Sequence, residues 1–142
     1  MKKIMIMAAS VLCCVLSMVM ASCDNSDGPT VAKPVVVLTE VGEENSKEAT
    51  AGKDLHLEGD LEAEGLIARI DVTIATADGK TTIVSKSYTE GKYIGVRNTT
   101  FHEHLDIPAD APEGEYHIRF TVTDADGHAT TEEVEGVMIT KG

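Results

Sequence analysis

The chain contains no tryptophan and few other aromatic residues, with three tyrosines and two phenylalanines among 142 residues. Because glycan-binding sites rely on exposed aromatic rings, this shortage disfavours carbohydrate binding. Basic residues are also scarce: 12 lysines and arginines stand against 24 aspartates and glutamates, giving a formal net charge of −12. Nucleic-acid binding requires a basic patch, so the sequence predicts no nucleic-acid partner.

Cysteine is absent from most of the chain. Cys13 and Cys14 lie within the uncharged, mostly apolar run from Ile4 to Met20, and Cys23 follows shortly after that run. No cysteine follows position 23. The sequence therefore excludes disulfides, thiolate metal sites and cysteine nucleophiles from residues 24–142.

The first 23 residues have the pattern of an export signal. Lys2 and Lys3 precede the apolar run, and the run ends in Ala21-Ser22-Cys23, which resembles the lipobox of bacterial lipoproteins. The resemblance implies cleavage before Cys23 and lipid on its sulfur, with residues 1–22 as the signal peptide. An ordinary cleaved signal peptide and a transmembrane helix are the alternatives. The small residues before Cys23 and the polar residues after it argue against the helix.

Residues 23–33 are predicted to be the lipidated cysteine and a flexible tether, because they are rich in Ser, Asp, Gly, Pro and Thr. Ten extended residues reach about 33 Å at most. Asp24 and Asp27 resemble the acidic surface-export signals of Bacteroidota lipoproteins, although those acids are usually adjacent. We expect an envelope protein anchored to the outer membrane, either periplasmic or exposed at the surface.

Residues 34–142 predict one all-β domain, an antiparallel β-sandwich of about seven strands with immunoglobulin-like or fibronectin-like topology. A continuous apolar run predicts a strand at 35–38, and alternating apolar residues and hairpin turns predict strands at 54–60, 66–76, 81–88, 100–107, from 116 up to a turn at 124, and at 129–140. In the third of these, the alternation places Ala68, Ile70, Val72 and Ile74 inward. Residues 42–53 are a polar connection, and residues 89–98 are a loop or a short strand. No window shows a helical period.

Three stretches carry a resemblance to a known family: GKDLHLE at 52–58, FHEHLDIPADAPEGEYH at 101–117 and VTDADG at 122–127. Together they resemble an uncharacterised family of short Bacteroidota lipoproteins with one immunoglobulin-like domain. The resemblance implies that fold and a lipid anchor, and it carries no activity to transfer.

Histidines give the clearest chemical signal. His102 and His104 are two positions apart on a predicted strand, so they share a face at about 6.6 Å. Immunoglobulin strand order places the strand of His56 beside them in the same sheet. Glu58, Asp60 or Asp106 could add a carboxylate, and such donors suit zinc, nickel or copper(II). The alternative is that these are ordinary polar residues on the solvated face of a sheet.

No nucleophile elbow, phosphate-binding glycine loop or paired-carboxylate cleft is evident, so we expect a non-enzyme with no certain cofactor. The Asp124-Ala125-Asp126-Gly127 run is interpreted as a hairpin turn in preference to a calcium site. The leading prediction is a lipid-anchored, non-catalytic binding or accessory module of the cell envelope, whose partner would be an outer-membrane protein or transporter. The alternatives are a transition-metal-binding lipoprotein that uses the histidines and a structural, adhesin-like spacer.

Overall fold

A computed structural model describes residues 31–142. The predicted signal peptide, the lipidation at Cys23 and most of the predicted tether lie outside the described residues. Within residues 31–142, no helix has the length and apolar character needed to cross a membrane.

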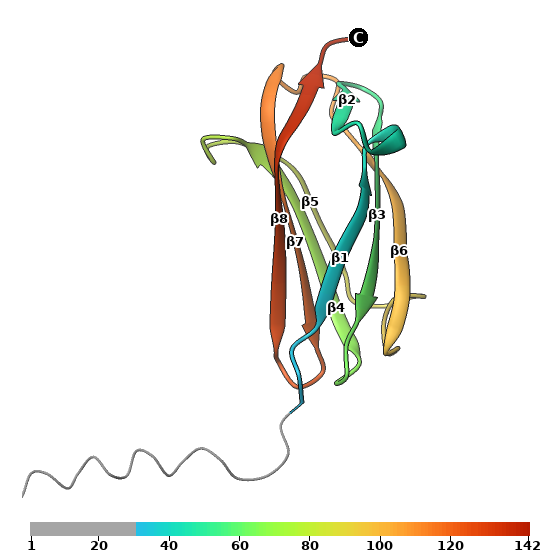
Figure 1. Ribbon diagram of the computed structural model, residues 1–142. Coiled ribbons are helices and arrows are strands. Elements are labelled where there is room, and N and C mark those ends of the chain that lie inside the picture. The colour runs from blue at the N-terminus through green and yellow to red at the C-terminus, as the bar shows by residue number, and fades with distance from the viewer. Residues whose placement is uncertain (1–30) are drawn as a thin grey trace, which may run out of the picture. The chain divides into compact units, whose positions relative to one another are not determined.

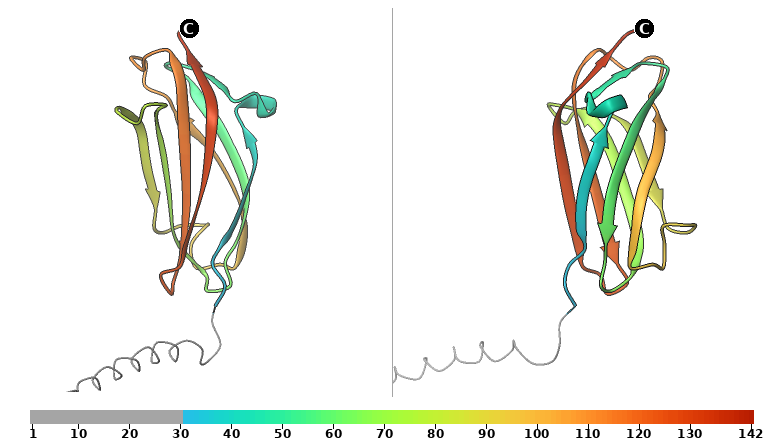
Figure 2. Two further views of the ribbon diagram at one scale, coloured as in Figure 1. Left: turned by 60° about the vertical axis from the view of Figure 1, so that its left-hand side comes forward. Right: turned by 45° about the vertical axis from the view of Figure 1, so that its right-hand side comes forward.

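Eight strands and one turn of 3₁₀ helix, η2 (Glu43–Asn45), make up the described part of the chain (Figure 1). The strands are β1 (Val35–Val41), β2 (Glu48–Thr50), β3 (Asp54–Glu62), β4 (Ile67–Thr76), β5 (Thr82–Tyr88), β6 (Asn98–Asp106), β7 (Gly114–Asp124) and β8 (Ala129–Thr140). One sheet has the order β1-β3-β6, and the other has the order β2-β8-β7-β4-β5. The two sheets form separate layers (Figure 2). The prediction of an all-β, immunoglobulin-like sandwich is confirmed.

The strand β2 was not predicted from the sequence. After β1 the chain leaves the three-stranded sheet, and β2 then pairs in parallel with the end of β8 in the other sheet. The crossing requires Gly42, which has φ of 80°, and a Cβ there would lie 2.9 Å from the backbone nitrogens of Lys47 and Glu48. A strand of three residues is too short to show alternation, so its polar sequence resembled a loop.

The core lies between the two sheets and contains several buried aromatic residues. Phe101 of β6 and Phe120 of β7 are fully buried and meet edge to face, with ring centroids 4.9 Å apart. Tyr116 is also buried, and its hydroxyl donates a 2.7 Å hydrogen bond to the carbonyl of Pro112. This bond back to the preceding loop is the tyrosine corner of immunoglobulin-like domains. Tyr93, from the loop between β5 and β6, is buried as well.

Two irregularities change which residues face inward. The register of β1 shifts between Leu38 and Glu40, and that of β4 shifts between Ile67 and Arg69. The predicted inward orientation of Ala68 is therefore wrong: Ile67 is buried, and Ala68 is only half-buried. A bulge adds one residue to a strand and so reverses the alternation beyond it.

Candidate metal centre

The candidate centre lies on the outer face of the three-stranded sheet, where β3 and β6 pair without a register shift from Asp54–Asp106 to Glu62–Asn98. This register sets His56 directly opposite His104 and Glu58 directly opposite His102. The reverse side of the same strands holds the sheet in the core, since Leu55 and Leu105 are 1% and 0% exposed. The predicted neighbourhood of the two strands is confirmed, and it brings His56 together with His102 and His104.

The three imidazoles form one cluster. The ring of His56 stacks on that of His102 with centroids 4.7 Å apart, and it lies 5.0 Å from the ring of His104. The rings of His102 and His104 are 5.6 Å apart. One ring nitrogen from each residue falls within 4.8 Å of the other two. Four-coordinate zinc with zinc–nitrogen bonds of about 2.05 Å needs nitrogens about 3.3 Å apart, so the ring nitrogens must approach one another by at most about 1.5 Å.

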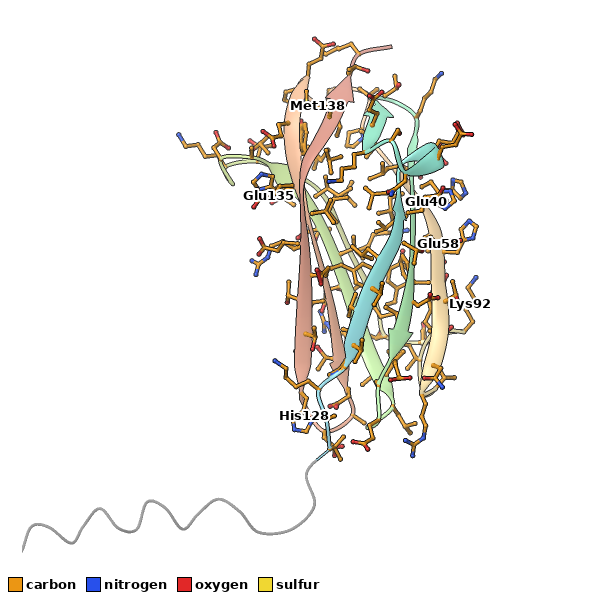
Figure 3. All side chains as sticks on the ribbon, in the orientation of Figure 1. Glu40, Glu58, Lys92, His128, Glu135 and Met138 are labelled. Atoms are coloured by element: carbon orange, nitrogen blue, oxygen red, sulfur yellow. The ribbon has the colours of Figure 1, made fainter. Side chains whose placement is uncertain are left out.

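Each imidazole has its own carboxylate. Glu58 Oε2 lies 3.1 Å from His102 Nδ1, and Asp54 Oδ2 lies 2.7 Å from His104 Nδ1. Glu40 Oε1, contributed by β1, lies 3.3 Å from His56 Nε2. Figure 3 shows Glu40 and Glu58 close together on this sheet, while His128 lies at the opposite end of the sandwich. Carboxylates that bind the second nitrogen of an imidazole fix its orientation and increase its basicity toward a metal.

The hydrogen bonds leave nitrogen lone pairs available. With Nδ1 of His104 hydrogen-bonded to Asp54 and Nδ1 of His102 3.1 Å from Glu58, the Nε2 atoms of both residues are free to act as ligands. His56 Nε2 is buried, and despite its distance from Glu40 it has no hydrogen bond of acceptable geometry among the described residues. A buried nitrogen without a partner is costly, and a metal ion at this position would satisfy it.

The sequence identified some of the acidic neighbours and missed others. Glu58 contacts the cluster as predicted, whereas Asp106 lies opposite Asp54 at the end of the strand pair and is outside the three-histidine group. Asp60 lies opposite Thr100, whose hydroxyl donates to it. Asp54 and Glu40 were not predicted as neighbours of the histidines. Alternation along β1 places Glu40 inward with Val36, and only the bulge turns it toward His56.

A groove of about 490 Å³ opens beside the cluster, with His56 and His104 in its wall. Its remaining lining comes from the segment between β1 and β3, namely Glu43, Glu48, Ala49, Thr50 and Lys53, and from Asp54 at the start of β3. His102 and His104 are half-exposed, at 50% and 55% for their side chains, and His56 is 18% exposed. The cluster can therefore exchange a ligand with solvent.

Asp124, Asp126 and His128 form a second group of close side chains at the β7–β8 turn. Here the buried Asp124 carboxylate is already satisfied: Oδ1 accepts from the amides of Asp126 and His128, and Oδ2 lies 3.1 Å from His128 Nδ1. Desolvation raises the pKa of Asp124, but these hydrogen bonds together hold it below its usual value. The geometry is that of a capped hairpin turn.

Comparison with known proteins places the chain in a family and a fold. A family model described as a domain of unknown function, DUF4625, matches residues 21–139. No curated protein matches the sequence. The match confirms the expected relation to an uncharacterised family, while Bacteroidota origin and lipid anchoring stay predictions.

Three solved structures are similar to this chain. The first is a DUF4466 family protein from Parabacteroides merdae, with a TM-score of 0.55 and 9% identity over 78% of this chain and 46% of that one. CopC from Methylosinus trichosporium OB3b has a TM-score of 0.42 and 20% identity over 75% and 95%. The sporulation control protein Spo0M from Bacillus subtilis has a TM-score of 0.49 and 13% identity over 79% and 50%. The chain spans about half the length of the first and third proteins, and the first likeness shows a shared fold alone.

Proposed function

We propose that this chain, which belongs to the DUF4625 family, binds a divalent transition metal ion through His56, His102 and His104 without catalysing a reaction. The observation that supports the proposal most strongly is the convergence of three imidazoles from two paired strands, each beside a carboxylate. The buried, unsatisfied Nε2 of His56 adds to it.

The donor set favours some metals over others. Three neutral nitrogen ligands suit zinc, nickel and copper(II), whereas calcium and magnesium require oxygen ligands. Asp54 and Glu58, which lie beside Nδ1 of His104 and His102, compensate the charge of the ion from outside the ligand set, and Glu40 lies beside His56 Nε2 itself. Because His102 and His104 are half-exposed, the bound metal can be captured from solution and passed on. These properties are those of a metal-capturing accessory protein.

The placement of the cluster fits an anchored protein. Val35 lies beside Glu62 at the end of β3, whereas His56 lies near the start of that strand, about 20 Å away at 3.3 Å per residue. The chain enters the domain next to the β7–β8 turn (Figure 1). With lipid on Cys23, Val31 lies eight residue steps beyond the anchor, a reach of about 28 Å at most. The histidines lie toward the end of β3 that is far from the point where the chain enters the domain, where an envelope partner such as a transporter could reach them.

Calorimetric titration of the purified protein with zinc tests the proposal. We expect one zinc per chain, and we expect the His102→Ala/His104→Ala variant to lose this binding. His117→Ala is the matched control, because His117 lies on β7 in the other sheet. Calcium should give no heat in the same experiment. Equal zinc isotherms for the wild type and the double variant would refute the proposal.

A further inference from the structure

The fourth coordination position of the ion decides what the site can do. Three imidazoles leave one position of a four-coordinate ion to be filled. A water there gives an open site that can do chemistry, whereas a fourth side chain gives a closed site that holds the ion. The side chain that the structure brings to this position is Glu40 of β1, whose Oε1 atom lies 3.3 Å from Nε2 of His56.

The contact between Glu40 and His56 has the spacing of two metal ligands. Asp54 and His104, in contrast, form a hydrogen bond of 2.7 Å. Glu40 Oε1 and His56 Nε2 lie 3.3 Å apart without hydrogen-bond geometry, and this nitrogen is buried with no partner among the described residues. About 3.3 Å is the separation of two ligand atoms on a tetrahedral zinc ion with bonds of about 2.05 Å. The pair can therefore take up an ion with no hydrogen bond to break.

Glu40 also faces a different ring nitrogen from the other carboxylates of the cluster. Glu58 and Asp54 lie beside Nδ1 of their imidazoles, across the ring from the Nε2 atoms that are free to bind an ion. Such carboxylates orient a ligand without touching the metal. Glu40 lies beside Nε2 of His56, the buried nitrogen that lacks a partner. It is therefore placed on the side of the ring where the ion would bind.

A bulge in β1 brings Glu40 to this face. The register of β1 against β3 shifts between Leu38 and Glu40, so that Val41 is buried in the core at 4% exposed and Glu40 lies on the outer face. The chain just after β1 is held to the strand of the cluster, because the Gly42 amide donates to the His56 carbonyl at 2.8 Å. Bulges are enriched next to functional sites, where they redirect a side chain. This bulge places one carboxylate beside a buried imidazole nitrogen.

We propose that Glu40 is the fourth ligand and closes the coordination of the ion. This inference rests on the proposed metal site. Glu40 lies outside the group of three imidazoles whose nitrogens fall within 4.8 Å of one another, so its side chain turns toward that group as the ion binds. With three imidazoles and one carboxylate as ligands, the ion has no water to activate. A partner that takes the metal has to displace Glu40, which is carried by an edge strand.

Cobalt(II) in place of zinc tests the proposal, because its visible absorption bands change with the ligands around the ion. Azide is the probe for an open position, since this small anion binds where no side chain does. We expect azide to leave the bands of the cobalt-loaded wild type unchanged. In Glu40→Ala the fourth position is open, so azide should shift the bands.

Zinc affinity is measured for the same proteins. The dissociation constant of Glu40→Ala should rise about 100-fold or more, because loss of an outer carboxylate alone costs about 10–100-fold. Glu62→Ala is the matched control, since Glu62 is an exposed carboxylate on the same face of β3, away from the histidines. The control should match the wild type in zinc affinity and in its response to azide. Circular dichroism checks that both variants fold like the wild type.

The two proposals can fail separately. If the wild type binds cobalt and azide shifts its bands, the position is open, so Glu40 is not the fourth ligand and the metal site stands. The same conclusion follows if Glu40→Ala binds zinc like the wild type, or if its cobalt bands do not respond to azide. If neither cobalt nor zinc binds to the wild type, the proposed function itself is wrong, and the role of Glu40 falls with it.

Discussion

Glu58 offers the sharpest test of how the carboxylates act on the metal. Its Oε2 atom lies 3.1 Å from His102 Nδ1, and the side chain does not itself belong to the three-nitrogen ligand group. Substitution Glu58→Gln keeps the shape of the side chain and removes its charge. We expect the variant to fold normally and to bind zinc more weakly.

The size of the effect follows from geometry. Adding the width of the imidazole ring and a zinc–nitrogen bond to the 3.1 Å between Glu58 Oε2 and His102 Nδ1 places the carboxylate about 7 Å from the ion. A unit charge and a double charge at about 7 Å in water interact by roughly 1.2 kcal/mol. Because about 1.4 kcal/mol corresponds to a tenfold change, the zinc dissociation constant should rise about sevenfold. Salt should reduce this difference, since the Debye length at physiological ionic strength is about 8 Å.

Competition with a chromophoric zinc chelator measures the dissociation constant over this range. Glu115→Gln is the matched control, because Glu115 lies 3.9 Å from the imidazole of His117 on the other sheet. The control should bind zinc like the wild type. Equal zinc affinities for Glu58→Gln and the wild type would show that the Glu58 charge does not act on the ion.

The remaining predictions concern stability. Tyr116→Phe should cost about 1 kcal/mol in the free energy of unfolding, because it removes the hydrogen bond to Pro112, whereas Tyr88→Phe should add about 1 kcal/mol, because the buried Tyr88 hydroxyl has no partner among the described residues. Denaturant unfolding of both variants checks this, and equal effects would contradict it. Hydrogen bonds keep the pKa of Asp124 below its ordinary 3.8, so the stability it contributes is complete above pH about 4 and is lost as pH falls through its lower folded value. The Asp124→Asn variant should therefore be less stable than the wild type at neutral pH, and the difference should shrink on acidification; a constant difference down to low pH would refute this assignment.

The sequence was sufficient to predict the histidine cluster because two strong regularities coincide there. Strict alternation in β3 and β6 separates Leu55 and Leu105 from His56 and His104, and immunoglobulin strand order makes the two strands neighbours. A one-residue slip would expose the leucines and bury the imidazoles, so the register needed no further information.

The missed features depend on local breaks in that regularity. Glu40 faces His56 only because of the bulge after Leu38. The residue types in β1 do not predict a bulge at that position. The crossing to β2 depends on pairing with β8, at the far end of the chain. Tyr93 is buried although it lies in an irregular loop, and its hydroxyl accepts from the His102 amide and lies within hydrogen-bond distance of the Glu103 carboxylate. The orientation of Glu40, the position of β2 and the burial of Tyr93 each depend on interactions with another strand, namely β3, β8 and β6.

The pairing of β3 with β6 also determines whether the domain would need a metal ion to fold. Leucines in the core fix the pairing of β3 with β6, and these side chains are buried whether or not an ion is present. The positions of the three imidazoles are therefore set by hydrophobic burial, and metal binding would have to close a gap of at most about 1.5 Å between ring nitrogens. A site of this kind can load and unload without unfolding the domain, in contrast to structural zinc sites whose ligands hold the fold together. Reversible loading is the property that metal transfer requires.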